Sequence, residues 1–169
     1  MFRKFWHKRA YQKGLRKSIS EKKINQNFKI KKIRILVDGS LGIEAEFFFD
    51  LIREFSIAQT NLFILLFPCG HPVEKQYSNV FNPDDITYFG SFKEELNLFC
   101  AKEADLQINY FNRSDLMMEW VANTSVSKLS AGFSGANEKI NDLIFDFDPQ
   151  EKETLKVELL KYLKILNKI

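Results

Sequence analysis

The sequence predicts an α/β protein, a Rossmann-like three-layer sandwich with a mostly parallel sheet of about six strands and a basic helical extension at the N-terminus. Three observations predict it. Short apolar runs alternate with amphipathic helical runs, as in chains that place helices between parallel strands. Residues 62–67 are apolar at every position, which is typical of a strand covered on both faces. The first 34 residues carry a net charge of +12 and the remainder −9, which separates a basic arm from an acidic body.

Length and composition bound the class of protein. The chain has 169 residues, 45% of them hydrophobic, which is enough for the core of one ordinary domain. The charged fraction of 28%, with 7 Gly and 4 Pro, excludes collagen-like and globally disordered chains. Cys69 and Cys100 do not form the dense pattern of a secreted disulfide scaffold. Because we find neither a transmembrane segment nor the apolar core of a signal peptide, we expect a cytoplasmic protein.

The expected elements follow in order from apolar periodicity and turn residues. Strands are predicted where apolar or β-branched residues run together, and helices where apolar residues recur every three to four positions. The strands are expected at residues 33–38, 62–67, 86–89, 106–111, 127–133 and 139–147. The helices are expected at residues 2–20, 43–56, 91–104, 114–121 and from 148 onward.

Local signals set several of these boundaries. Pro68 ends the second strand, and Ser91 with Glu94 forms an S-x-x-E capping box at the start of a helix. Asp148 followed by Pro149 is the expected cap of the last helix. We divide the chain into a basic helical arm, residues 1–27, and a single α/β domain, residues 28–169. In a Rossmann-type order the first strand is central, with 62–67 and then 86–89 on one side of it.

A candidate ligand site lies where the chain reverses beside the first strand. Ligands of open parallel sheets bind outside the carboxyl ends of the strands at this point, so a nucleotide or sugar nucleotide is the expected ligand class. The residues that form this lip are Asp38, Gly39, Ser40, Gly42, Asn112, Arg113 and Ser114. The turn after the first strand is neither G-x-G-x-x-G nor G-x-x-x-x-G-K-[ST], and Asp before Gly is also ordinary turn chemistry.

Catalytic and metal motifs are not evident. No G-x-S-x-G elbow is present, so we predict no catalytic residue. Cys69 and His71 have C-x-H spacing, but a structural zinc needs four ligands and the only other histidine is His7. Asp146 and Asp148 form a D-x-D pair, of which Asp148 is already explained as a cap. We therefore predict no metal and no cofactor, and we expect Cys69 to be a reduced thiol without a catalytic role.

The arm is the second candidate site. Its bases alternate with the aromatic residues Phe5, Trp6 and Tyr11, a combination that suits RNA because phosphates attract cations and bases stack on rings. An anionic lipid surface and an acidic protein, including the body of this chain, are alternatives. We expect a helical arm that is loosely attached to the body. The residues expected to bind the anionic partner are Arg3, Lys4, Trp6, Lys8, Arg9, Lys13, Arg16 and Lys17.

Two resemblances add to this interpretation. The stretch D-L-Q-I-N-Y-F-N at 105–112, with V-S-K-L-S-A-G-F at 126–133, resembles the N-terminal half of heptosyltransferase-like GT-B glycosyltransferases. With N-D-L-I at 141–144 and L-K-Y-L-K-I-L at 160–166, the body is similar to a family of small Bacteroidota proteins classified as a domain of unknown function. The second resemblance spans most of the chain and implies an α/β domain without an assigned activity.

We therefore expect a binding or accessory module rather than an enzyme. Its basic arm would dock on an anionic partner, with an RNA-containing assembly favoured. The alternative is a small protein that binds a nucleotide or sugar nucleotide, as one half of a dimeric GT-B-like enzyme. A GT-B enzyme holds its donor mainly in a second domain, and this chain supplies one half, so the alternative requires a partner chain or a homodimer.

Overall fold

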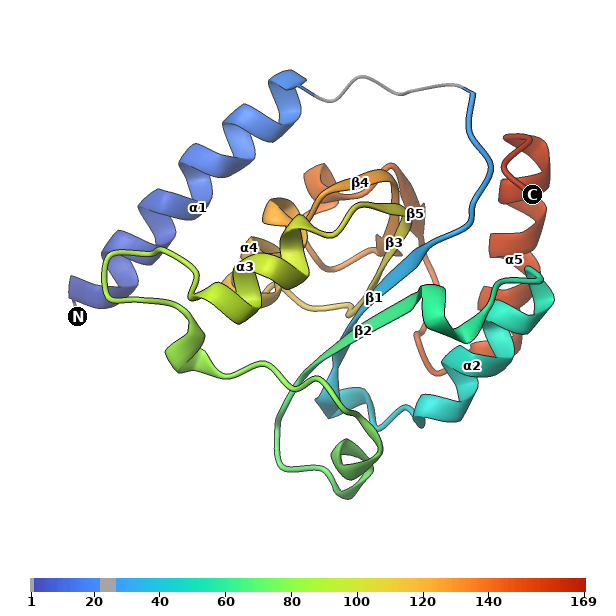
Figure 1. Ribbon diagram of the computed structural model, residues 1–169, viewed down its shortest axis with the longest axis horizontal. Helices are drawn as coiled ribbons and strands as arrows, with labels where there is room; N and C mark the ends of the chain where they lie inside the picture. The colour runs from blue at the N-terminus through green and yellow to red at the C-terminus, as the bar shows by residue number, and fades with distance from the viewer. Residues whose placement is uncertain (1, 22–26) are drawn as a thin grey trace.

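The chain forms one parallel sheet covered by helices on both faces (Figure 1). The computed structural model describes the backbone of residues 2–21 and 27–169 and the side chains of residues 4–15 and 27–169. The five strands are ordered β2-β1-β3-β4-β5, and every neighbouring pair is parallel. Their bounds are Ile33–Asp38 for β1, Leu62–Phe67 for β2, Ala104–Tyr110 for β3, Ser127–Phe133 for β4 and Leu143–Phe145 for β5. This result confirms the predicted α/β class with a parallel sheet.

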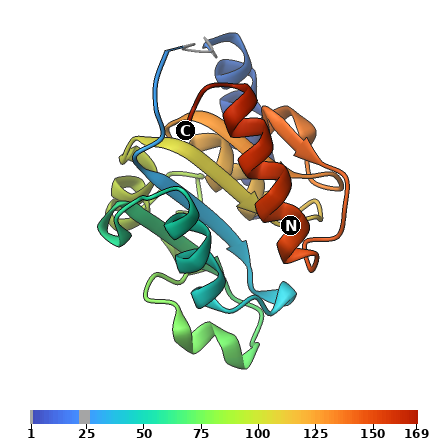
Figure 2. The same cartoon turned by 90° about the vertical axis from the view of Figure 1, so that its right-hand side faces the viewer.

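Two helices cover one face of the sheet and three lie on the other. Figure 2 shows α2 and α5 in front of the sheet and α1 behind it. The side chains of α3 and α4 pack in the same core cluster as Tyr11 of α1. The helices are α1 (Phe2–Glu21), α2 (Ala45–Glu54), α3 (Glu94–Ala101), α4 (Leu116–Thr124) and α5 (Lys152–Ile165). No helix in the described ranges is both long enough and apolar enough to cross a membrane.

The expectation of about six strands is wrong, because residues 86–89 form a turn. Ile86 makes a single antiparallel bridge with Phe92, and the chain reverses between them at Gly90, whose φ is 88°. Only Ile86 of this apolar run is buried, at 1% exposure. A run of β-branched and aromatic residues therefore predicted a strand where one residue anchors a turn. The last strand is also shorter than expected, since residues 138–140 form a 3-10 turn.

Three helix starts differ from the predicted caps. The Ser91 amide donates to Thr87 Oγ1, so Ser91 belongs to the turn, and α3 begins at Glu94 without a side-chain cap. The helix expected from residue 114 instead has Asp115 as its cap, because the Asp115 Oδ1 accepts the amides of two residues in the first turn of α4. Asp148 accepts the amide of Gln150 in the turn that precedes α5. Asp and Ser side chains serve turns as readily as helix caps, which is why these boundaries were misplaced.

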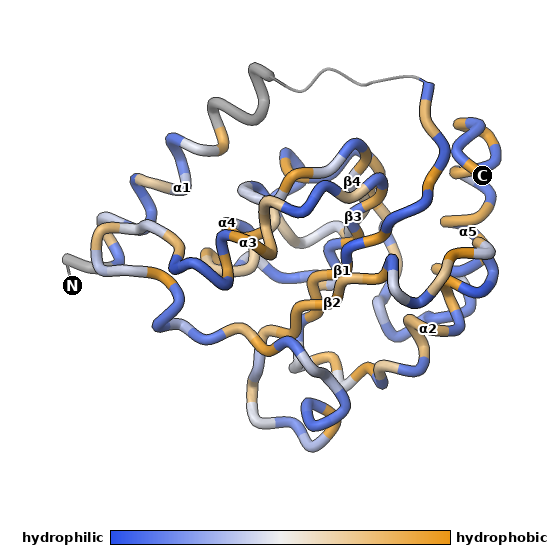
Figure 3. The backbone as a smooth tube through the Cα atoms, in the orientation of Figure 1, coloured by the Kyte–Doolittle hydropathy of each residue, from blue (hydrophilic) through white to orange (hydrophobic). Residues whose placement is uncertain are grey.

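The two faces of the sheet have different chemistry. On the face toward α2 and α5, which we call face one, the strands bury mainly apolar side chains, among them Ile35, Val37 and Ile108. On the opposite face, face two, Arg34, Gln107 and Asn109 are almost completely buried. Figure 3 shows orange, hydrophobic segments around β1 and β2 and a more mixed colouring in β3, β4 and α1.

The two ends of the described body meet beside α5. The Ile30 amide donates to the Lys168 carbonyl at 2.9 Å. The Lys29 ammonium donates to Asn167 Oδ1 at 3.0 Å and to the Ile169 carbonyl oxygen at 3.2 Å. The segment that enters β1 is therefore fastened to the segment that follows the last helix.

Candidate functional site

The inner face of α1 is docked on α4 and on the turn at residues 86–92. His7 is 2% exposed, and its Nε2 lies 2.9 Å from the Thr87 carbonyl oxygen, to which it donates. The His7 ring meets the edge of Trp120 at a centroid distance of 5.3 Å. Gly14 lies so close to α4 that a Cβ there would be 3.3 Å from Asn123 Nδ2. These contacts differ from the expectation of a loosely attached arm.

A buried carboxylate fixes the middle of α1. The Tyr11 hydroxyl donates to Glu119 Oε2 at 3.0 Å, and the Asn137 side-chain amide donates to the Tyr11 oxygen at 2.8 Å. The other oxygen of Glu119 accepts from the Ser114 hydroxyl and from the Asn137 backbone amide. Burial, together with the charge of Glu119, raises the pKa of Tyr11 well above its ordinary value. One carboxylate thus connects α1, α4 and the segments that follow β3 and β4.

The exposed surface of α1 carries the predicted cations. We call the exposed Lys4, Lys8, Arg9 and Lys13 the α1 cations. Within the described residues, no carboxylate forms an ion pair with any of them. Arg3, Arg16 and Lys17 belong to α1, and their side chains lie outside the described part. The structure therefore places four of the predicted bases on one exposed helix.

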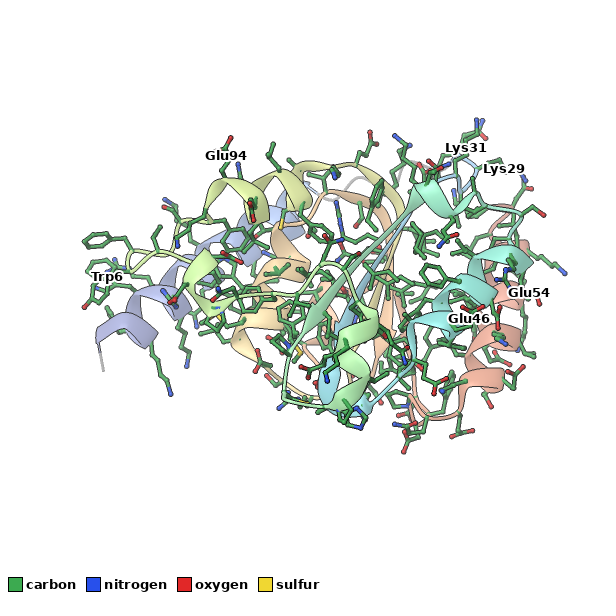
Figure 4. All side chains as sticks on the ribbon, turned by 60° about the horizontal axis from the view of Figure 1, so that its bottom comes forward. Trp6, Lys29, Lys31, Glu46, Glu54 and Glu94 are labelled. Carbon is green, nitrogen blue, oxygen red and sulfur yellow. The ribbon has the colours of Figure 1, made fainter. Side chains whose placement is uncertain are left out.

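Aromatic side chains gather where α1 meets the turn at residues 86–92. Phe5 and Trp6 are 59% and 40% exposed, so much of their ring surface is not packed against the body. Tyr88 and Phe89, which directly follow the carbonyl bound by His7, are 48% and 74% exposed. We call these four residues the aromatic tip. Trp6 lies at the end of the molecule opposite Glu46 and Glu54 (Figure 4).

The predicted ligand lip is held together by an ion pair. Asp38 is completely buried at the carboxyl end of β1, and Arg113 follows β3, the neighbouring strand. Arg113 Nε donates to Asp38 Oδ2 at 2.5 Å and its Nη2 donates to Oδ1 at 3.2 Å. Burial alone would raise the pKa of Asp38, but the Arg113 guanidinium and the Ser40 amide outweigh it and hold that pKa below its usual range. Asp38 raises the pKa of Arg113 in return.

Neighbouring loops pack closely against this ion pair. A Cβ on Gly39 would be 2.7 Å from the Phe67 carbonyl oxygen, which explains why glycine follows Asp38. Gly42 has a φ of 62° and faces the His71 ring, while a Cβ on Gly135 would collide with the Asn112 carbonyl. The Gln150 side chain donates to the Leu41 carbonyl at 2.6 Å. The carboxyl edge of the sheet is thus a set of interlocked loops.

The structure brings some of the predicted lip residues together, while others bond to residues outside the lip. Asp38, Ser40 and Arg113 form one hydrogen-bonded group. Ser114 instead serves the buried Glu119, so its hydroxyl supports the docking of α1. Ligand binding by this lip stays a prediction. Within the described residues, no three His, Cys, Asp or Glu side chains are grouped as a metal site requires.

The loop that follows β2, residues 68–76, has its own network of hydrogen bonds. Glu74 Oε1 accepts the backbone amides of Cys69, Gly70 and His71 at 2.6, 2.9 and 3.0 Å. These hydrogen bonds, the one from Cys69 first, lower the pKa of Glu74. His71 Nδ1 accepts the amide of Val73, so its neutral ring carries the proton on Nε2. The C-x-H spacing therefore belongs to a closed turn.

Sequence reasoning missed the residues that hold and extend the α1 surface. His7 and Tyr11 were not recognised as anchors, because their partners lie 80 and 108 positions away. Tyr88 and Phe89 were assigned to a strand, although exposed rings beside the turn residue Gly90 are also consistent with a displayed turn. The alternation of bases and rings in residues 4–13 was the signal that did find this surface.

Comparison with known proteins gives one result. No curated protein and no solved structure matches the chain. The resemblance to glycosyltransferases therefore has no support from these comparisons. A family profile described as "Family of unknown function (DUF6913)" matches residues 3–166, which include both α1 and the α/β body. The chain therefore belongs to DUF6913, a family of unknown function.

Proposed function

We propose that this protein is a binding module that docks on RNA through the α1 cations. The observation that carries the proposal is that one face of α1 is docked while four cations around the rest of the helix are exposed. His7 and Tyr11 fasten one face of the helix to the body. Lys4 and Lys8 are exposed beside this docked face, and Arg9 and Lys13 are exposed on the far side of the helix. A docked helix presents its charges in a fixed arrangement, which reduces the conformational entropy lost on binding.

The placement of these cations opposes the stability of the helix. Lys4 and Lys8, like Arg9 and Lys13, are four positions apart and repel each other by roughly 0.2–0.5 kcal/mol per pair. The first turn of α1 holds no acidic residue and the last turn no basic residue, so neither end complements the helix dipole. A polyanion bound to these cations would relieve this repulsion.

The acidic body does not provide the missing anions. Two carboxylates of α2 pair within their own helix, since Arg53 binds both Glu46 and Asp50. In α5, Lys156 and Lys161 pair with Glu153 and Glu158. Both helices lie on the opposite face of the sheet from α1 (Figure 2). The division of the chain into a basic helical arm, residues 1–27, and a single α/β domain, residues 28–169, is part of this proposal.

The test is the salt dependence of RNA binding by the full chain. Four phosphate contacts to a single strand give a slope of about −3 for log K against log salt. Binding of an RNA hairpin with an unpaired tail is measured by fluorescence anisotropy across a salt series. A variant with Lys4, Lys8, Arg9 and Lys13 all changed to Gln is expected to lose nearly all of that slope.

A matched control carries the same change in net charge elsewhere. Lys31, Lys32, Lys75 and Lys164 are exposed and lie outside α1, and all four are changed to Gln. This control is expected to keep at least half of the slope. Equal binding by the α1 variant and the native chain would contradict the proposal, and so would binding to anionic vesicles without binding to RNA.

A further inference from the structure

We infer that the aromatic tip is a stacking platform for unpaired bases, so that the RNA bound by α1 is single-stranded where it reaches Phe5, Trp6, Tyr88 and Phe89. This inference rests on the proposed function, because the α1 cations bring the strand to the tip. It adds a second segment, the turn at residues 86–92, to a surface that the sequence assigned to the arm alone.

The turn holds its two rings outward through defined contacts. Its base is anchored because Ile86 is 1% exposed and bridges Phe92, whose ring packs near Trp120 at 5.5 Å. The Thr87 amide donates to the Ser91 carbonyl at 2.8 Å, and Thr87 Oγ1 accepts the Ser91 amide at 3.0 Å. Tyr88 and Phe89 are the residues that this closed turn leaves at its apex.

The turn is also fixed to α1. His7 donates to the Thr87 carbonyl, one residue before Tyr88, and His7 itself directly follows Trp6. Gly90 approaches α1 so closely that a Cβ would be 3.1 Å from Ala10 Cβ and 2.9 Å from the Trp120 ring. The positive φ of Gly90 and this close approach both require glycine. The two pairs of rings are therefore mounted on segments that are bonded to each other.

The rings are arranged with open flat faces. Phe5 and Trp6 meet edge to face, with centroids 6.0 Å apart and an interplanar angle of 79°. Tyr88 and Phe89 meet in the same way at 5.4 Å and 83°. In an edge-to-face pair, only one face of one ring is covered by its partner. Since the four side chains are 40–74% exposed, flat aromatic surface remains available to a base.

The chemistry next to the rings favours a nucleic acid over a lipid surface. Toward the middle of α1 the exposed residues are Lys8, Arg9, Gln12 and Lys13, so the apolar surface is confined to the tip. A helix that lies in a membrane interface needs an apolar face along its length. Rings adjoining a row of cations instead match single-strand recognition, in which cations follow the backbone and aromatic side chains stack on bases.

The experiment separates stacking from phosphate binding. The full chain is titrated with a single-stranded RNA, with the same sequence in a duplex, and with an abasic strand that keeps the phosphates and lacks the bases. Each stacked base is worth roughly 5- to 150-fold in affinity. The native protein is expected to bind the single strand at least tenfold more tightly than the abasic strand.

The variants remove rings and leave the cations intact. Tyr88→Ser with Phe89→Ser is expected to reduce the preference for the single strand over the abasic strand by roughly fivefold or more, while Phe5 and Trp6 retain the remainder. The control, Val157→Ser with Ile165→Ser, removes exposed apolar side chains from α5 and is expected to keep the native preference. A thermal unfolding curve shows that both variants remain folded. Quenching of Trp6 fluorescence by the single strand, lost in Trp6→Phe, is a second expected result.

The outcomes that overturn the inference differ from those that overturn the proposed function. Equal native affinity for the single strand, the duplex and the abasic strand would remove the stacking platform and leave phosphate binding by α1 in place. Loss of vesicle binding in the ring variant, with no change in RNA binding, would assign the tip to a membrane surface instead. Failure of every RNA to bind would end both proposals.

Discussion

The two faces of the sheet are formed by the same strands but hold their helices in different ways. Face one buries apolar side chains against α2 and α5, among them Ile35 and Ile108. Face two buries Arg34, the neighbour of Ile35, together with Gln107 and Asn109. Hydrophobic contact is non-directional, whereas hydrogen bonds need defined partners and angles. The helices of both faces pack on apolar clusters. The comparison teaches that those of face two are positioned in addition by buried hydrogen bonds.

Arg34 shows how face two works. Its guanidinium donates to the carbonyls of Phe99 and Lys102, at the end of α3, and to the Val126 carbonyl just before β4. Burial lowers its pKa to about 10, so the side chain is still charged at neutral pH. The negative end of the α3 dipole faces this charge. A single buried cation therefore fixes where α3 ends.

A chain of amides continues from Arg34 across the sheet. Gln107 Oε1 accepts from Arg34, and Gln107 Nε2 donates to Asn109 Oδ1 at 3.0 Å. Asn109 Nδ2 donates to Asn141 Oδ1 at 2.7 Å. Gly132 makes room for Asn141, since a Cβ at that position would collide with its side-chain amide. The polar chain thus runs from β1 through β3 to the segment before β5.

The sharpest way to break the comparison is to move the arginine by one residue. Ile35→Arg places the same charge on face one, where the neighbouring helices bury apolar side chains. We expect a loss of at least about 4 kcal/mol, enough to abolish cooperative unfolding in urea. Ile35→Val, the control, is expected to cost about 1 kcal/mol. A native-like unfolding midpoint for Ile35→Arg would show that face one tolerates charge.

Removing the arginine tests face two itself. Arg34→Leu leaves the carbonyls of α3 and Val126 without their donor, and unsatisfied buried acceptors cost about 1–3 kcal/mol each. Loss of the desolvated charge offsets part of this, so we expect a net loss of about 3 kcal/mol in urea denaturation. Arg53→Leu removes an exposed arginine from α2 and is expected to change stability by less than about 0.5 kcal/mol. Equal effects of the two changes would contradict the distinction.

The ion pair at the end of face two predicts a pH dependence. Because the folded pKa of Asp38 lies below its unfolded value, its contribution is present above about pH 4 and is lost as the pH falls through the folded pKa. Arg113→Leu leaves burial as the dominant influence on Asp38. We expect a loss of about 1–2 kcal/mol at pH 7 that shrinks below pH 4.

Thermal or urea unfolding at several pH values checks this prediction. Arg113→Lys keeps the charge but cannot form the two-point contact with Asp38, so it is expected to lose less stability than Arg113→Leu. A loss for Arg113→Leu that is constant from pH 7 to pH 3 would show that the pair does not contribute through the charge of Asp38.

The smallest effect concerns the coupling between neighbouring amides. Gln107→Leu leaves the Asn109 side-chain oxygen without its donor, and Asn109→Leu leaves the Gln107 side-chain amide without that acceptor. The double variant removes both groups of this hydrogen bond. We expect the double variant to be about 1 kcal/mol more stable than the sum of the single changes predicts. Gln107→Leu combined with Val157→Ser, on separate faces, is expected to be additive. Additivity in both pairs would mean that the amides act independently.

The sequence predicted face one better than face two. Alternating apolar residues such as Ile33, Ile35 and Val37 identify a buried strand by composition alone. Arg34 and Gln107 occur between such residues and look like solvent-facing positions of the same strands. Their partners are backbone carbonyls and amides from distant segments, which no local pattern encodes. The carbonyl oxygens that accept hydrogen bonds from Arg34 come together only when the chain has folded.

The candidate site likewise has one part that the sequence predicted and one part that it did not. The α1 cations were predicted, because charge density is visible in composition. The docking of α1 through Tyr11 and Glu119 was not predicted, since it depends on a hydrogen bond across 108 positions. Tyr88 and Phe89 were expected in a strand, because exposure of an apolar residue depends on the turn that displays it. Composition therefore located the surface, and tertiary structure was needed to find its second half.

The hydrogen bonds between residues 29–30 and residues 167–169 have a practical consequence for protein engineering. Because the segment entering β1 is bonded to the segment after α5, the α/β body begins and ends at almost the same point in space. Domains with adjacent ends tolerate insertion into a host loop and circular permutation. The body is thus suited to be carried as an insert, and α1 to be joined again after residue 169 through a flexible linker. Such a rearranged chain would show whether docking of α1 depends on the order of connection or only on the surface that receives it.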